Sequence, residues 1–84
     1  MELRVLQYFV TAAEEKSITK AGKMLHVTQP TISRQIKDLE FELGTPLFIR
    51  GHHTLELTEK GKVLQEKARE ILLLCECTKK ELCC

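Results

Sequence analysis

The chain has 84 residues, of which 43% are hydrophobic and 30% charged, and its formal net charge at pH 7 is +1. This length fits one small domain with a marginal core that dimerisation would help. The near-neutral charge indicates low non-specific affinity for nucleic acid at physiological salt. Because no run is long enough to cross a membrane and no signal peptide begins the chain, a cytoplasmic location is expected.

Basic side chains are concentrated in the middle of the chain. Residues 16–62 carry eight basic and five acidic side chains, whereas residues 1–15 carry one basic and three acidic ones. Residues 63–84 carry four of each. A modest positive excess therefore lies over the part of the sequence with the strongest binding signals.

Two helices are predicted before residue 26. An apolar stripe at helical spacing runs along residues 1–16: Leu3, Leu6, Val10 and Ala13. Tyr8 is expected nearer the outer side of this helix, facing a neighbouring helix or a second subunit. Ser17 is the predicted N-cap of a short helix, residues 18–25, in which the small Gly22 permits a close crossing with the next helix.

The segment from Val27 to Gly44 is predicted to be a third helix with both ends marked. Thr28 is a good N-cap, because its hydroxyl can accept from an unpaired backbone N–H one turn in. Pro30 lies in the first turn, where a missing N–H costs nothing. Gly44 ends the helix and Pro46 prevents its continuation. One apolar stripe faces the core: Ile32, Ile36, Leu39 and Leu43.

The other side of this third helix carries the main functional signal. Away from the core, toward the N-terminal half, lie Gln29, Pro30, Ser33, Arg34 and Lys37. A short helix, a tight turn and a second helix with such a polar start form the helix-turn-helix pattern. The second helix then enters a DNA major groove, where Gln and Arg reach base edges and phosphates. For this helix alone, an ordinary solvated face is an equally good interpretation.

Two short apolar runs after the third helix predict a β-hairpin. They flank a turn that contains Gly51, and Leu55 and Leu57 share one face at period two. A hairpin in this place is the wing of a winged helix-turn-helix. Its tip would approach phosphates or the minor groove through Arg50, His52 and His53. The alternative is a plain solvent loop.

The last helix is predicted to begin after Thr58, a fair N-cap, with Glu59 suited to the positive helix terminus. Spacings of three and four then alternate along a heptad seam: Gly61, Leu64, Ala68, Ile71, Cys75, Thr78 and Leu82. A long amphipathic helix has little of its own chain to pack on in so small a domain. A partner helix from a second copy is therefore expected, while residues 72–74 suit packing on the first helix as well.

Three motifs at these spacings carry a resemblance to a known family. They are Q-P-x-x-S-R-Q-I, E-x-E-L-G-x-P-L-F-x-R and L-T-x-x-G. Together they closely resemble the N-terminal DNA-binding domain of LysR-type transcriptional regulators, from Leu3 to about Leu74. The resemblance implies a mainly α winged helix-turn-helix in residues 1–58 and a linker helix in residues 59–84 that pairs two subunits.

The resemblance also implies a sequence-specific, dimeric binder of double-stranded DNA. The implied DNA-binding residues are Thr28, Gln29, Pro30, Thr31, Ser33, Arg34, Lys37 and Arg50, and the position of the predicted wing tip adds His52 and His53. The heptad seam supplies the predicted dimerisation residues: Leu64, Ala68, Ile71, Cys75, Thr78 and Leu82. Gln29 is the best candidate for a base contact. Full-length members carry a second domain that binds a small effector; since this chain lacks it, the chain is a fragment or a naturally short relative.

Three positions depart from the family's usual pattern. His52 and His53 stand where a basic pair is usual near the wing tip, and Glu56 is acidic where a basic or neutral residue is usual. Phe41 replaces a typically charged residue on the helix face opposite the core stripe. An exposed phenylalanine there would mark a contact with another subunit or protein, or a single exposed apolar residue of the common kind.

The four cysteines lie within the last ten residues, at positions 75, 77, 83 and 84. A secreted disulfide scaffold spreads its cysteines through the chain, so reduced thiols in a cytosolic protein are favoured. Because ligands two apart on a helix point to different faces, no metal site is predicted. A zinc site and an oxidised dimer through Cys75 are the alternatives.

No enzyme activity and no cofactor are predicted. The sequence has no phosphate-binding loop and no pair of carboxylates that this fold would bring together. The rival interpretation is an interaction module that dimerises and modulates a full-length regulator without binding DNA strongly. The near-neutral charge and the histidines of the wing favour the rival, whereas Gln29, Ser33 and Arg34 favour DNA binding.

Overall fold

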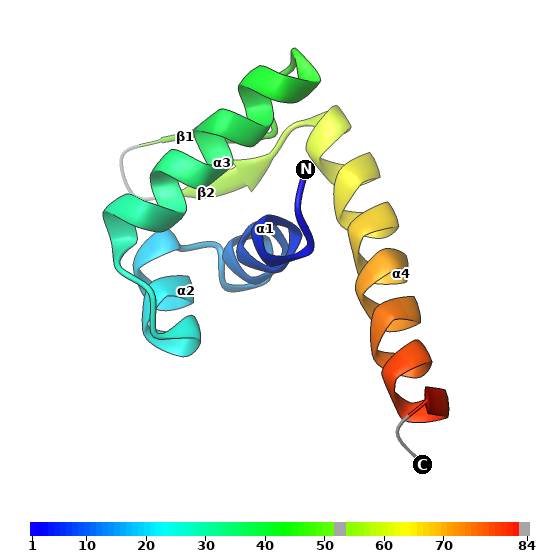
Figure 1. Ribbon diagram of the computed structural model, residues 1–84. Coiled ribbons are helices and arrows are strands. Elements are labelled where there is room, and N and C mark those ends of the chain that lie inside the picture. The colour runs from blue at the N-terminus through cyan, green and yellow to red at the C-terminus, as the bar shows by residue number, and fades with distance from the viewer. Residues whose placement is uncertain (52–53, 83–84) are drawn as a thin grey trace.

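A computed structural model describes residues 1–51 and 54–82. The elements are α1 (Leu3–Glu15), α2 (Ile18–Leu25), α3 (Gln29–Leu43), β1 (Phe48–Arg50), β2 (Leu55–Leu57) and α4 (Glu59–Leu82). α1, blue in Figure 1, lies in the middle of the molecule, with α2 and α3 on one side and α4 on the other. The predicted fold, a helix-turn-helix core with a hairpin wing and a long C-terminal helix, is confirmed.

The ends of the first three helices follow local signals. The Ser17 hydroxyl accepts from the backbone N–H of Lys20 at 3.1 Å, which confirms Ser17 as the N-cap of α2. Gly44 ends α3 in the left-handed conformation with φ 71°, as predicted. α1 is shorter than the predicted residues 1–16: its last residue is Glu15, and the C-cap Lys16 adopts the same left-handed conformation with φ 53°.

The hydrophobic core is built around α1. Seven of the 13 residues of this helix are buried, which is more than a single apolar stripe would contribute. The reason is that α2 and α3 cover one side of α1 and α4 covers another. Phe9 is fully buried, and the centroid of its ring lies 5.2 Å from that of Phe48 in β1. From α3, the buried side chains are Ile32, Ile36 and Leu39. The core thus joins α3 and the hairpin to the same central helix.

Three side chains lie differently from the sequence-based prediction. Tyr8, expected nearer the outer side of α1 and facing a neighbouring helix or a second subunit, is only 8% exposed, because α1 is covered on both flanks. Leu3 and Leu43, expected in the core stripes, are 46% and 40% exposed. Both residues lie in the terminal turns of their helices, and these turns extend beyond the elements that cover the rest of each apolar stripe.

The backbone of α2 lies in close contact with the turn that leads into α3. A Cβ atom at Gly22 would lie 2.6 Å from the carbonyl oxygen of Val27, closer than real Cβ atoms come. The backbone N–H of Val27 donates to the carbonyl oxygen of Gly22 at 3.0 Å. The turn before α3 therefore packs directly on α2, which confirms the predicted role of Gly22.

Glu40 joins the hairpin to α3. Its carboxylate accepts from the backbone N–H of Leu47 at 2.6 Å and from that of Phe48 at 3.3 Å. The same carboxylate lies 3.8 Å from the guanidinium of Arg50. Strands β1 and β2 pair antiparallel, with Arg50 opposite Leu55. One side chain of α3 thus holds both the start and the far end of β1.

The motif L-T-x-x-G connects the hairpin to α4. The Thr58 hydroxyl accepts from the backbone N–H of Gly61 at 3.0 Å, which confirms Thr58 as an N-cap, and donates to the carbonyl oxygen of Pro46 at 2.8 Å. The backbone N–H of Thr58 donates to the carbonyl oxygen of Leu47 at 3.0 Å. A Cβ at Gly61 would overlap that carbonyl oxygen. Glycine is needed because α4 begins directly against the segment that leads into the wing.

The first prediction concerns the crossing of α2 and α3. Gly22→Ala should lower the free energy of unfolding by about 1–2 kcal/mol, because the overlap with Val27 outweighs the roughly 1 kcal/mol that alanine gains in a helix. Gly51→Ala is the matched control, since its Cβ meets mainly the flexible side chain of Thr54. Urea unfolding followed by circular dichroism compares the two, and equal stability of both variants would contradict the proposed close packing.

The second prediction concerns the attachment of the wing. Glu40→Ala should lower the free energy of unfolding by about 1–3 kcal/mol, because two part-buried N–H groups lose their acceptor. Glu66→Ala, at an exposed position of α4, should stay within about 0.5 kcal/mol of wild type in the same urea titration. A Glu40→Ala variant as stable as Glu66→Ala would show that the carboxylate does not hold the hairpin.

Candidate nucleic-acid interface

The start of α3 presents a polar face to solvent. The core holds one side of this helix, so the opposite side is left open (Figure 1). Four of the predicted DNA-binding residues on α3 are exposed: Gln29, Pro30, Arg34 and Lys37. Thr31 and Ser33 are half-buried. The exposed residues and Ser33 recur at intervals of three and four, so the helix brings them onto one continuous face.

Thr28 occupies the N-cap position of α3, but its hydroxyl does not cap the helix. This part of the prediction is wrong. The Thr28 hydroxyl lies 2.7 Å from the hydroxyl of Thr31, so the two side chains hydrogen-bond each other. The first backbone N–H groups of α3 are consequently not covered by the Thr28 side chain. They point forward from the positive end of the helix, toward the place that an anion would take.

Gln29 is the first residue of α3 and is linked to α2. The hydroxyl of Thr19 donates to the side-chain oxygen Oε1 of Gln29 at 3.2 Å. Both residues are exposed. The amide of Gln29 is thus held at the leading end of the helix.

Arg34 and Lys37 are the cations of this face. Among the described residues, no acidic side chain forms an ion pair with either of them, so their charges are available to phosphates. The acidic residues of α3 lie farther along, at Asp38, Glu40 and Glu42. Of these, Glu42 pairs with the amino terminus of Met1 at 2.9 Å. The positive part of α3 is therefore its first half.

The wing places Arg50 at the end of β1. Arg50 is exposed, and its guanidinium faces Glu40 of α3 rather than extending freely. Glu56 is exposed on β2, and its neighbour Leu55 is buried, so the predicted alternation of this strand is confirmed. His52 and His53, predicted at the tip of the wing, lie outside the described residues.

Two residues near this face were not predicted from the sequence to act there. Thr19 binds Gln29, and Glu40 binds the wing and Arg50. A weak sequence signal existed for Thr19, since it lies three residues before Gly22 and therefore on the side of α2 that crosses α3. For Glu40 the charge alone gave no signal, because its partners are backbone N–H groups seven and eight residues later.

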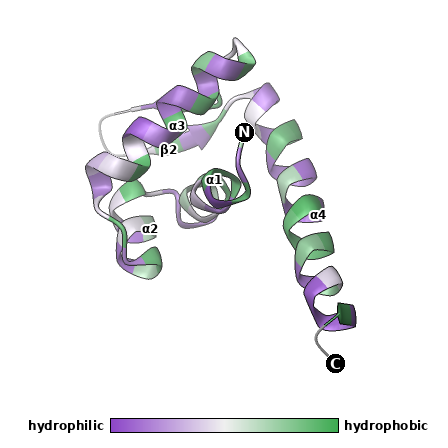
Figure 2. Cartoon of the chain, in the orientation of Figure 1, coloured by the Kyte–Doolittle hydropathy of each residue, from purple (hydrophilic) through white to green (hydrophobic). Residues whose placement is uncertain are grey.

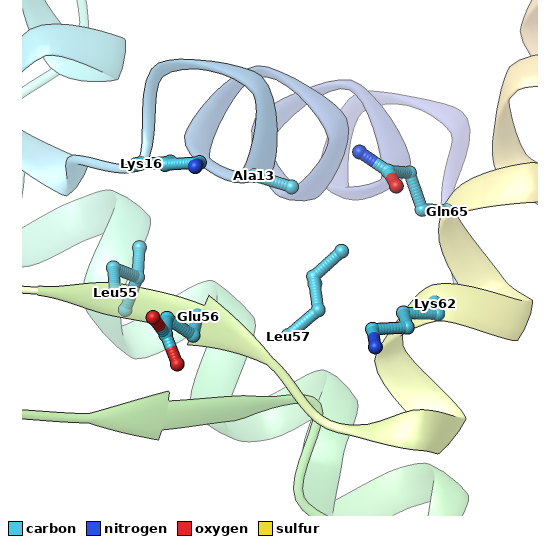
Figure 3. A pocket seen from close by; sticks show the side chains of 7 residues that line it. All are labelled: Ala13, Lys16, Leu55, Glu56, Leu57, Lys62 and Gln65. Atoms are coloured by element: carbon cyan, nitrogen blue, oxygen red, sulfur yellow. The ribbon is translucent and has the colours of Figure 1, made fainter.

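A hollow of about 420 Å³ lies elsewhere, between the end of α1, β2 and the start of α4 (Figure 3). Its lining mixes apolar residues with Lys16, Glu56 and Lys62. Lys62 also pairs with Glu59 at 3.4 Å. None of the predicted DNA-binding residues lines this hollow. It is thus separate from the polar face of α3.

The predicted seam of α4 divides into two parts. Gly61 and Ala68 are buried in the core of their own chain, and Leu64 packs against that core. Ala68 is therefore not available to a partner helix, because α1 already covers it. Farther along α4, exposed residues at spacings of three and four form one stripe: Ile71, Leu74, Thr78 and Leu82. Figure 2 shows hydrophobic segments along much of α4.

Cys75 is half-buried and Cys77 is exposed, and both are free thiols. The two side chains thus face different environments, as the helical spacing predicts. Within residues 1–51 and 54–82, no helix is long and apolar enough to cross a bilayer.

Known proteins are similar to this chain in sequence and in fold. A family model described as "Bacterial regulatory helix-turn-helix protein, lysR family" matches residues 3–62. The HTH-type transcriptional regulator BudR of Klebsiella aerogenes is 53% identical over 74 residues, which cover 88% of this chain and 52% of BudR. The regulator BsdA of Bacillus subtilis (strain 168) is 49% identical over 73 residues, which cover 86% of this chain and 25% of BsdA. The chain thus spans about half of one relative and a quarter of the other.

A solved structure shows the same fold. The structure described as "Crystal Structure of BenM_DBD/catB site 1 DNA Complex" matches with a TM-score of 0.95 and 40% sequence identity, covering 98% of this chain and 91% of that chain. The match extends through α4 as well as the helix-turn-helix. Sequence, fold and motif spacing agree, and this chain belongs to the lysR family of bacterial regulatory helix-turn-helix proteins.

Proposed function

We propose that this chain is the DNA-binding domain of a bacterial transcriptional regulator and places the first half of α3 in the major groove. The observation that carries the proposal is the exposed face of α3, on which Gln29, Arg34 and Lys37 stand open while the opposite side is fixed in the core. A rigid helix with amide and guanidinium groups on one side suits base edges and phosphates. The relative named BenM_DBD was solved as a DNA complex, which supports the same role here.

The wing supplies a second contact in this proposal. Arg50, with His52 and His53, would approach a phosphate or the minor groove beside the site of α3. Arg50 lies 3.8 Å from Glu40, a long separation for an ion pair near the surface. A phosphate can therefore take the place of Glu40 at little cost. Thr28, Thr31 and Ser33 add hydroxyl groups for phosphate contacts at the start of α3.

A homodimer would present two such faces to one duplex. We assign residues 1–58 to DNA binding and residues 59–84 to the linker and dimer contact. The exposed part of the predicted seam, with Ile71, Thr78 and Leu82, lies on the stripe that α1 leaves uncovered. Two half-sites would then lie on one face of the duplex, about 34 Å or a multiple of this distance apart. Pairs of dimers would extend this arrangement to higher order.

The proposed role is binding without catalysis, in the cytoplasm, where bacterial DNA is found. The relatives BudR and BsdA are both named transcriptional regulators. Binding should weaken with added salt, because Arg34, Lys37 and Arg50 replace counterions on phosphates. The small net charge of +1 means that specific contacts must supply most of the affinity.

Arg34→Ala tests the role of α3. Loss of the guanidinium should weaken binding to a selected duplex by about 1–3 kcal/mol, whether Arg34 contacts a base or a phosphate. Fluorescence anisotropy of a labelled duplex at two salt concentrations measures this change. The matched control is Arg4→Ala, an exposed arginine of α1 whose only described ion pair is with its neighbour Glu2.

The control should bind as wild type does. If Arg34→Ala binds with unchanged affinity and unchanged salt dependence, α3 is not the DNA-binding element. Circular dichroism of both variants confirms that the helices are intact.

Ile71→Glu tests the dimer contact. Ile71 is 38% exposed on α4, and a carboxylate in its place would be buried against a partner helix without a counter-charge. The dimer should dissociate to monomers at micromolar concentration in sedimentation equilibrium. Leu73→Glu is the matched control, because residues two apart on a helix face different directions and Leu73 is 65% exposed off the stripe. Dissociation of the control alone would place the contact on another side of α4.

A further inference from the structure

We propose that Thr19 orients the amide of Gln29 and thereby helps to determine which base Gln29 accepts. This inference rests on the proposed function. The Thr19 hydroxyl donates to Oε1 of Gln29 at 3.2 Å across the helix-turn-helix. Thr19 is thus a positioning residue that acts on DNA through another side chain.

The backbone brings these two residues together. Thr19 lies three residues before Gly22, so both face the start of α3 from the same side of α2. Gly22 lets the turn approach so closely that a Cβ there would lie 2.6 Å from the carbonyl oxygen of Val27, and the same Cβ would be in ordinary contact, at 3.7 Å, with the backbone nitrogen of Gln29. Thr19, Gly22 and Gln29 line one open hollow of about 350 Å³, together with Lys23, His26 and Thr28. The pair therefore lies at the edge of the proposed interface, on a rigid part of the fold.

The direction of the hydrogen bond decides what Gln29 offers to DNA. A threonine hydroxyl can both donate and accept, and here it donates its proton to the amide oxygen of Gln29. With Oε1 turned toward α2, the amide presents its NH₂ group, which carries two donors, to the groove. Once DNA excludes water from this region, the lower local dielectric strengthens the bond that holds this orientation.

An oriented NH₂ group selects among bases. In the major groove it can donate to N7 of a purine, to O6 of guanine or to O4 of thymine. Cytosine offers only its amino group there, which needs an acceptor. With Oε1 engaged by Thr19, cytosine at the contacted position is disfavoured. If Thr19 is removed, the bond that holds Oε1 toward α2 is lost, and the amide turns over more readily to accept from cytosine.

The test measures base preference with wild type, Gln29→Ala, Thr19→Val and Thr19→Ser. A selected-site pool first identifies the position at which Gln29→Ala makes the four bases equivalent. Anisotropy titrations on four duplexes that differ at that position then give each variant's preference as a ratio of affinities. Thr19→Val keeps the shape of the side chain and removes the hydroxyl, whereas Thr19→Ser restores it. Thr11→Val makes the same change on another helix, α1, and serves as the matched control.

We expect Thr19→Val to reduce the discrimination against cytosine by roughly three- to tenfold, the worth of one neutral hydrogen bond. Thr19→Ser and Thr11→Val should discriminate as wild type does. If Thr19→Val still discriminates against cytosine as wild type does, the inference is overturned but the proposed function is not. An equal loss of affinity for all four duplexes has the same meaning, since it would indicate that Thr19 contacts a phosphate. Persistent preference in Gln29→Ala also overturns it. Wild-type protein that binds no duplex selectively would overturn the proposed function as well.

Discussion

The burial of one side of α3 against α1 is the interaction on which the rest of the structure depends. Ile32 and Ile36 are fully buried there, so the helix cannot rotate without exposing them. Everything polar at its start is consequently fixed in direction. Gly22 sets the approach from α2, and Glu40 fixes the wing to the last turns of the same helix. The face proposed for DNA is the side of α3 that these three attachments leave free.

Much of this fold could be predicted from sequence, because the ends of helices depend on nearby residues. Ser17 and Thr58 cap helices through backbone N–H groups three residues away, and Gly44 ends α3 by its own conformation. Long-range contacts could not be predicted in the same way. Tyr8 is buried because two separate parts of the chain cover α1. At the candidate site, helical spacing predicted the exposed face, but the bond from Thr19 to Gln29 depends on how two helices cross.

α4 serves two purposes along its length. Its first half packs on α1 and the hairpin through Gly61, Leu64 and Ala68, and so completes the core of a very small domain. Its second half leaves apolar side chains such as Leu74 and Leu82 exposed. A regular heptad pattern in the sequence spans both halves and does not reveal where one partner ends and another begins. The boundary between these two halves of α4 follows from the lengths of the helices. α1 has 13 residues and α4 has 24, so α4 extends beyond the helix on which it packs.

The central claim is that the start of α3, supported by the wing, is the surface that meets DNA. Amide chemical shifts of the ¹⁵N-labelled protein, recorded while a selected short duplex is added, test it most directly. The account predicts that the largest changes fall on residues 28–37 and near Arg50, with little change around Ala68 in α4. The claim would be contradicted by saturable binding that leaves the amide resonances of residues 28–37 unchanged and instead shifts those of Phe41 or of the exposed stripe of α4.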